Sequence, residues 1–282
     1  MQQLTPQPMH LVDSYDDGHD TKHLTFELLG GNRNTSVAVG QFFMLSLPGF
    51  GQAPFTYASL PNKEGRFMAL IRKVGKLTAA ICDLPPGKVL GYNGPLGIGW
   101  PVAQMLNKEV LIVAGGCGLA PLTATIDHLI KMRQSGSTTV IYGATNRASQ
   151  VLQHERQRWQ AHLPILETFM VDSQLDTLGT PSEHISRFLA EHNRQPQLVL
   201  TCGPLAMMES VAKTCQELAI GHDKIWLSLE KRMGCGVGLC GHCYLANELI
   251  CVQGPTYRYD QFATLEKKTT AFATHDGLFQ YC

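Results

Sequence analysis

The chain has 282 residues, enough for two modest domains or three small ones. Its 23 basic and 23 acidic residues balance, so no positive surplus is available to neutralise nucleic-acid phosphates, which argues against a nucleic-acid-binding protein. The first residues are polar and do not have the layout of a signal peptide. The longest uncharged stretch, residues 110–126, is interrupted by glycines and a proline. We therefore expect a cytoplasmic protein without a membrane span.

The texture of the sequence predicts three domains. Residues 1–104 contain short apolar runs separated by Gly and Pro, which predicts a β-barrel or sandwich. Residues 105–225 alternate strand-like and helix-like runs, the rhythm of a parallel α/β sheet. Residues 226–282 carry a group of cysteines and a less regular tail. Examples of the expected strands are Thr25–Leu29, Gln41–Leu47, Phe67–Arg72, Lys88–Tyr92, Val110–Ala114, Thr139–Tyr142 and Leu198–Thr201. The expected helices include Ala79–Leu84, Leu122–Arg133, Gln150–His162 and Leu205–Leu218.

Two short stretches of the first domain are candidates for cofactor contacts. The first is Pro54-Phe55-Thr56-Tyr57, which follows the strand expected over Gln41–Leu47. The second, Gly75-Lys76-Leu77-Thr78, opens the helix expected over Ala79–Leu84. Taken alone, the first stretch also fits a turn with a core aromatic ring, and the second fits the end of a strand.

Two turns of the second domain indicate a nucleotide site. Gly115, Gly116 and Gly118 follow a buried strand and precede a helix in whose first turn Pro121 fits. Such a turn lets the backbone approach a pyrophosphate near the helix N-terminus, although glycine turns in α/β proteins are also often purely structural. A second strand ends in Cys202-Gly203-Pro204. Since both turns would lie at the carboxyl edge of one sheet, they would face the same crevice.

The strongest motif is the cysteine group. Cys235, Cys240 and Cys243 have the C-x4-C-x2-C spacing of plant-type [2Fe–2S] proteins, and Cys251 follows as a fourth ligand. Glycines between these cysteines let a short loop curl around a cluster, because glycine adopts positive φ without steric cost. The alternative is a structural zinc site, but zinc usually takes paired C-x2-C knuckles and only one such pair is present.

Together and in this order, these stretches resemble the ferredoxin–NADP reductase superfamily, in the branch with a C-terminal [2Fe–2S] domain. The resemblance extends from Met9 to about Tyr259. The branch includes gamma subunits of cytoplasmic nickel–iron hydrogenases (sulfhydrogenases), the corresponding subunit of anaerobic sulfite reductase, and the electron-transfer subunit of dihydroorotate dehydrogenase. Residues 71–78 and 94–97 look most like the hydrogenase gamma subunits.

The resemblance implies a flavin-binding β-barrel, an α/β NAD(P) domain and a small iron–sulfur domain. It places Phe55 on the isoalloxazine ring and the Thr56 hydroxyl near N5. It assigns the FAD pyrophosphate to Arg72 and to the stretch from Gly75 to Thr78, and it puts Cys202 near the nicotinamide. The superfamily motif usually begins with Arg where this chain has Ala53, so Arg72 or Lys76 would supply that phosphate contact. The choice of FAD over FMN follows from the resemblance alone.

The nucleotide preference and the redox partner stay open at this stage. Arg147 follows the second expected strand and is a candidate for the 2′-phosphate of NADP, while NAD is equally compatible. No triad or carboxylate pair indicates a catalytic side chain. We expect an electron-transfer subunit linking NAD(P)H, FAD and a [2Fe–2S] cluster to a partner redox subunit of hydrogenase, sulfite reductase or dihydroorotate dehydrogenase type, with a nickel–iron hydrogenase favoured. The alternatives are a self-sufficient NAD(P)H reductase and a non-catalytic zinc-stabilised adaptor.

The end of the chain is unusually aromatic. Such side chains are enriched at protein interfaces, but packing onto the chain's own domains is an equal alternative. The residues concerned are Tyr257, Tyr259, Phe262, Phe272, Phe279 and Tyr281.

Overall fold

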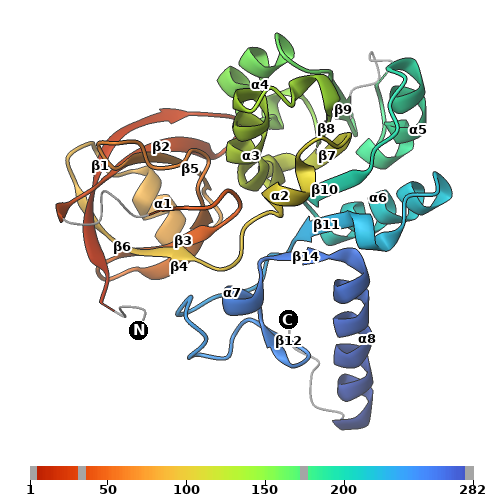
Figure 1. The fold of residues 1–282 in the computed structure, drawn as a ribbon. Coiled ribbons are helices and arrows are strands. Elements are labelled where there is room, and N and C mark those ends of the chain that lie inside the picture. The colour runs from red at the N-terminus through yellow and green to blue at the C-terminus, as the bar shows by residue number, and fades with distance from the viewer. Residues whose placement is uncertain (1–4, 31–35, 172–176, 277–282) are drawn as a thin grey trace.

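The computed structural model describes residues 5–30, 36–171 and 177–276 (Figure 1). The first part is a six-stranded antiparallel sheet in the order β4-β3-β6-β1-β2-β5. It closes into a barrel where the chain beyond β4 meets β5, since the Ala58 N–H donates to the Met68 carbonyl at 2.8 Å. The strands are β1 (Gln7–Asp16), β2 (Thr21–Leu28), β3 (Phe42–Leu47), β4 (Gly51–Thr56), β5 (Arg66–Arg72) and β6 (Val89–Leu96), with α1 (Lys76–Cys82) after β5.

Aromatic side chains fill the barrel. The rings of Phe43 and Phe67 meet edge to face with centroids 5.1 Å apart, an arrangement that favours the quadrupoles of both rings. The hydroxyls of Tyr57 and Tyr92, the polar ends of this aromatic group, are hydrogen-bonded to each other at 2.6 Å. Both phenols are therefore satisfied inside an apolar core, and burial raises the pKa of Tyr92 to about 12.

The second sheet has the order β14-β11-β10-β7-β8-β9, parallel except for β14. Its strands are β7 (Val110–Gly115), β8 (Thr138–Ala144), β9 (Ile165–Phe169), β10 (Leu198–Cys202), β11 (Ile225–Ser228) and β14 (Thr256–Arg258). The accompanying helices are α2 (Val102–Met105), α3 (Ala120–Lys131), α4 (Gln153–Gln160), α5 (Pro181–Glu191) and α6 (Leu205–Glu217). Short 3₁₀ turns cover Gly116–Leu119, Ser135–Ser137, Arg147–Ser149 and His222–Lys224.

Both faces of this sheet are covered by apolar side chains, as its continuous hydrophobic strands predict. Successive residues of β7 point to opposite faces: Leu111 and Val113 pack with residues of α5 and α6, whereas Ile112 packs with residues of α3. Helix α3, which covers one face of the sheet, also contacts the segment that follows the barrel, because the Trp100 ring nitrogen donates to the Pro121 carbonyl at 2.8 Å. The parallel α/β arrangement is confirmed.

The third segment contributes a strand to the second sheet and shares a hydrophobic core with the barrel. Its cysteine loop lies between β11 and the small hairpin of β12 (Tyr244–Leu245) and β13 (Glu248–Leu249), followed by α7 (Ile250–Gln253) and α8 (Tyr259–Asp276) (Figure 1). Since β11 and β14 belong to the second sheet, the boundary expected between residues 225 and 226 falls inside β11. The division into 1–104, 105–225 and 226–282 stays a prediction.

The aromatic residues of the tail whose side chains are described pack onto the chain itself. Tyr257 and Phe262 are 4% and 3% exposed and share a core with barrel residues Phe42 and Met44. Phe279 and Tyr281 lie outside the described residues, as does the side chain of Phe272. Among the described residues, no helix is long and apolar enough to cross a membrane.

Candidate cofactor sites

A cleft of about 1650 Å³ lies where the barrel, the second sheet and the third segment meet. Its lining draws on residues that are far apart in sequence but were singled out as cofactor contacts. They are Pro54, Phe55, Thr56, Arg72, Thr78, Gly115, Gly116, Gly118, Pro121, Cys202, Gly203 and Pro204. The structure therefore brings the expected flavin and nucleotide stretches to one cavity.

The flavin stretch is the inner part of β4, which pairs with β3. Pro54 lies opposite Met44, and Thr56 lies opposite Phe42, which also lines the cleft. The half-buried Phe55 ring has its centroid 6.4 Å from that of Phe43, so the barrel core supports it from behind. A rigid strand thus presents an aromatic ring and a hydroxyl to the cleft, which fits the flat ring system of a flavin.

Arg72 and Thr78 both line the cleft, beside the start of α1. Arg72 is exposed at the end of β5. The Thr78 hydroxyl accepts hydrogen bonds from the N–H groups of Val74 and Gly75 at 3.0 and 3.1 Å. Because Thr78 already satisfies these two donors, a phosphate here would rely on Arg72 and on the remaining N–H groups at the start of α1.

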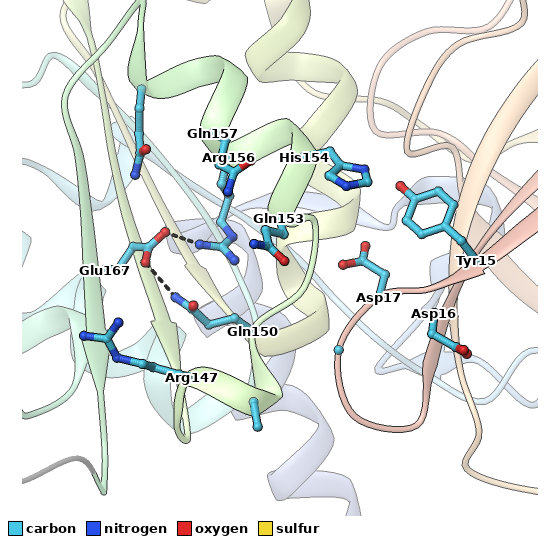
Figure 2. Close-up of a pocket in the computed structure, with 13 residues that line it drawn as sticks. Tyr15, Asp16, Asp17, Arg147, Gln150, Gln153, His154, Arg156, Gln157 and Glu167 are labelled. Carbon is cyan, nitrogen blue, oxygen red and sulfur yellow. Dashed lines mark hydrogen bonds and ion pairs between the residues drawn. The ribbon is translucent and has the colours of Figure 1, made fainter.

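Four expected contacts lie outside the lining of this cleft. Tyr57 is fully buried in the barrel core. Gly75 and Lys76 are exposed beside Val74, which does line the cleft. Arg147 lines a separate pocket of about 520 Å³ (Figure 2). Its guanidinium carbon lies 5.8 Å from the centre of the Phe169 ring. Its neighbours Asn146 and Ala148 reach the main cleft.

The glycine turn after β7 allows a close approach between two backbones. A Cβ added at Gly118 would lie 2.5 Å from the Cys202 carbonyl oxygen and 2.7 Å from the Gly203 Cα. Gly116 has a φ of +53° and open space around its Cα. The turns after β7 and β10 therefore pack together and leave room in front of the strand ends, as a pyrophosphate requires.

Cys202 is a protonated thiol rather than a nucleophile. It is 1% exposed, and burial raises its pKa well above the usual value. A compact, neutral side chain at this place leaves space for a flat ring without offering it a charge.

Sequence reasoning missed several residues of the cleft. Cys117, Asn146 and Met207 line it, as do Glu230 and Lys231 from the segment after β11. Cys117 lies inside the glycine turn, and Met207 lies three residues after Pro204, so proximity to the recognised motifs was the signal available for both.

The four expected metal ligands are collected in the third segment. Cys240 is exposed, Cys235 is half-buried, and Cys243 and Cys251 are buried. Burial opposes ionisation of Cys235, but backbone hydrogen bonds outweigh it and lower its pKa to about 7. The donors are the N–H groups of Val237, Leu239 and Cys240, at 3.4, 3.2 and 3.4 Å from the Cys235 sulfur.

This loop has the form that an iron–sulfur cluster needs. Gly236, Gly238 and Gly241 have φ values of +75°, +80° and +73°, the left-handed region that glycine adopts freely. Glycine at these positions lets the chain curl around the four sulfur atoms, so the loop fits a cluster held by cysteine thiolates.

The cysteine loop packs directly on the barrel behind the flavin stretch. A Cβ added at Gly236 would meet Leu96 and Met44 at 2.7 and 2.8 Å. The Gln52 amide donates to the Gly234 carbonyl at 2.6 Å. Met44 is the strand partner of Pro54 and Gln52 belongs to β4 itself, so the cysteine loop contacts both strands that carry or neighbour the flavin stretch. The loop is exposed at its outer end, where His242 and Cys240 lie.

The three segments match three family models. Residues 8–99 match the oxidoreductase FAD-binding domain, residues 112–213 the oxidoreductase NAD-binding domain, and residues 230–263 the iron–sulfur cluster binding domain of dihydroorotate dehydrogenase B. Together with the cleft and the cysteine loop, these matches define a flavin- and nucleotide-binding oxidoreductase with an iron–sulfur domain. When bound, flavin exchanges both hydride and single electrons, and a cluster carries single electrons onward.

Individual relatives narrow the family. The chain is 32% identical over 233 residues to the sulfhydrogenase 1 subunit gamma of Pyrococcus furiosus, covering 78% of each chain. It is 30% identical over 263 residues to the probable dihydroorotate dehydrogenase B (NAD(+)) electron transfer subunit of Thermococcus kodakarensis, covering 90% of this chain and 97% of that one. A solved structure of an NADH-dependent reduced ferredoxin–NADP oxidoreductase shares the fold over 98% of both chains, with a TM-score of 0.73 and 20% identity.

The chain belongs to the family of flavin and iron–sulfur electron-transfer subunits that includes these hydrogenase gamma and dihydroorotate dehydrogenase B subunits. The resemblance stated from the motifs is thereby confirmed.

Proposed function

We propose that this protein is the electron-transfer subunit that connects NAD(P)H, through FAD and a [2Fe–2S] cluster, to a nickel–iron hydrogenase in the cytoplasm. The observation that carries the proposal is the position of the cysteine loop, which packs on β3 behind the cleft and exposes Cys240 on its outer side. This arrangement supports a path from the cleft to the surface of the molecule. The likeness to sulfhydrogenase gamma subunits favours hydrogenase as the partner.

The proposed assignment of residues follows the lining of the cleft. Pro54, Phe55 and Thr56 would contact the flavin ring, and Arg72 would contact its pyrophosphate. The glycine turn from Gly115 to Gly118 and the turn at Cys202 would hold the nicotinamide nucleotide. The ligands of the cluster would be Cys235, Cys240, Cys243 and Cys251.

The surface around the cluster loop supports docking of a partner subunit. Leu239, Tyr244 and Val252 are 70%, 55% and 44% exposed. An added Cβ at Gly238 would lie 3.0 Å from Val252, and one at Gly241 would lie 3.5 Å from Tyr244, so both side chains border the loop. Exposed apolar side chains gathered beside a redox centre are suited to a protein interface.

Leu239→Asp is therefore expected to abolish capture of the partner. A buried, unpaired charge in such an interface costs several kcal/mol, roughly a hundredfold or more in affinity. Affinity purification of the tagged chain from its native cell should bring down a nickel-containing subunit. The purified complex should reduce NAD(P) with hydrogen. The variant should lose both while keeping its flavin and iron.

The matched control is Val89→Asp, which places the same charge at a 51% exposed position of the barrel. It should retain the partner. Co-purification of dihydroorotate- or sulfite-linked activity would reassign the partner. A purified chain that completed a physiological reaction alone would replace the subunit proposal with the self-sufficient reductase.

The nucleotide preference gives a separate prediction. If Arg147 meets a 2′-phosphate, Arg147→Ala should lower kcat/KM for NADPH roughly tenfold or more, because a charged hydrogen bond is worth about 1.5–3 kcal/mol. The value for NADH should stay unchanged. Steady-state dye reduction with both nucleotides measures the ratio, and an unaltered ratio would remove Arg147 from the nucleotide site.

A further inference from the structure

A second cluster of ligand-type side chains lies where the barrel meets the second sheet, away from the cysteine loop. Asp17 and His23 come from the β1–β2 hairpin, and Glu155 comes from the first turn of α4. Each offers a ligand atom within 4.8 Å of the other two. All three are buried, with 6%, 1% and 6% of their surface exposed.

The hydrogen bonds around this cluster leave two buried atoms without partners. Both Asp17 carboxylate oxygens accept from the Leu152 N–H at 2.9 Å. His23 Nδ1 is hydrogen-bonded to the Tyr15 hydroxyl and lies 3.9 Å from Glu155 Oε1. His23 Nε2 and Glu155 Oε2 have no partner and no contact with solvent. Leaving such groups unpaired costs free energy, so the cluster as it stands is incomplete.

The charges of this cluster favour the binding of a cation. Among the described residues, neither Asp17 nor Glu155 forms an ion pair with a lysine or arginine. The nearby Arg156 donates instead to the Val151 carbonyl at 2.9 Å and to Glu167. The two buried carboxylates of the cluster therefore lack a lysine or arginine partner among the described residues.

We propose that Asp17, His23 and Glu155 bind one divalent first-row transition-metal ion of the Zn²⁺ type. One imidazole and two carboxylates form a donor set that such ions accept, with water completing the coordination. Tyr15, through its hydrogen bond to the ring, holds His23 in orientation, as outer groups commonly do in metal sites. The ion would tie the β1–β2 hairpin of the barrel to α4 of the second sheet.

The structure also provides an entrance to this site. The pocket of about 520 Å³ in Figure 2 is lined in part by Tyr15, Asp17 and His154, whose polar ends point toward one another. Since Asp17 belongs to both the pocket and the buried cluster, an ion could reach the ligands from solvent by this route.

The test uses the full-length protein with flavin and iron in place, so that the four cysteines are occupied. After chelator treatment, the protein is dialysed against micromolar Zn²⁺, and zinc and iron are measured in the same sample. We expect one zinc per chain in addition to the iron. His23→Gln and Glu155→Gln should each lose at least nine-tenths of the zinc and keep the iron. His162→Gln, at an exposed position, is the matched control and should bind like the unaltered chain.

Thermal stability gives a second readout. If the cluster had a purely structural role, Tm would not depend on Zn²⁺. With chelator present, Glu155→Gln should be as stable as the unaltered protein or more so, because it removes a buried unpaired carboxylate. With Zn²⁺ present, the unaltered protein should gain roughly 5 °C in Tm and the variant should gain nothing. Should His23→Gln fail to fold, the isosteric Glu155→Gln decides alone. Zinc absent from the unaltered protein, zinc retained by both variants, or no Zn²⁺-dependent gain in Tm of the unaltered protein over Glu155→Gln would overturn the proposal.

Discussion

Replacing Cys240 by serine is expected to cut electron flow after the flavin while leaving flavin reduction intact. Cys240 is the exposed ligand of the cysteine loop and directly follows Leu239 of the apolar surface proposed for the partner. A serine hydroxyl is a much poorer ligand for iron than a thiolate, because it stays protonated near neutral pH. The cleft contains no atom of Cys240, so the nucleotide and flavin sites should be unaffected.

The measurement compares two steps in the same preparation. The unaltered chain should contain about two irons per chain and release flavin on denaturation. In Cys240→Ser, stopped-flow reduction of the flavin by NAD(P)H should proceed at an unchanged rate, while electron transfer to the partner falls roughly a hundredfold or more. Cys215→Ala is the control, since burial raises the pKa of that thiol to about 12 and it does not line the cleft.

Two outcomes would contradict this order of cofactors. Loss of flavin reduction in a folded Cys240→Ser variant would place the cluster before the flavin. Zinc in place of iron in the unaltered protein, with no visible absorbance, would support the adaptor and remove the cluster.

The sequence predicted those parts of the fold whose signal is local. The strand Val110–Ala114 and the helix after it were recognised because the buried run and the glycine turn are contiguous. Strand β1 was missed, since its polar residues and the register shift between Leu11 and Asp13 break the alternation that marks a strand. The pairing of β14 with β11 was invisible as well, because it depends on a short segment returning to the sheet after the cysteine loop.

The candidate sites divide in the same way. The cysteine ligands fall within one short segment, so their spacing alone indicated a cluster. The placement of Arg147 away from the main cleft depends on how the chain turns after β8, which no motif encodes. The group formed by Asp17, His23 and Glu155 lies between two domains, so the spacing of these residues in the sequence could not have predicted that they lie close together.

Gly118→Ala is expected to abolish use of the nucleotide while sparing the flavin. The added Cβ would lie 2.5 Å from the Cys202 carbonyl oxygen and 2.7 Å from the Gly203 Cα, and both are backbone atoms that cannot rotate away. The turns after β7 and β10 must therefore move apart, which misplaces the N–H groups proposed to meet the pyrophosphate. Gly136→Ala is the matched control, since its Cβ would meet nothing within 4 Å.

The expected result is a loss of roughly a hundredfold or more in kcat/KM for NAD(P)H, because displacements of about 1 Å in a positioned site have effects of that size. Reduction of the bound flavin by dithionite should be unchanged, as should the flavin and iron contents, which report that the barrel and the cysteine loop have folded. The contrast between NAD(P)H and dithionite is decisive, because dithionite reduces the flavin without binding at the glycine turn. Unchanged kinetics with NAD(P)H in a folded Gly118→Ala protein would show that the nucleotide binds elsewhere, and the assignment of the two turns would then fail.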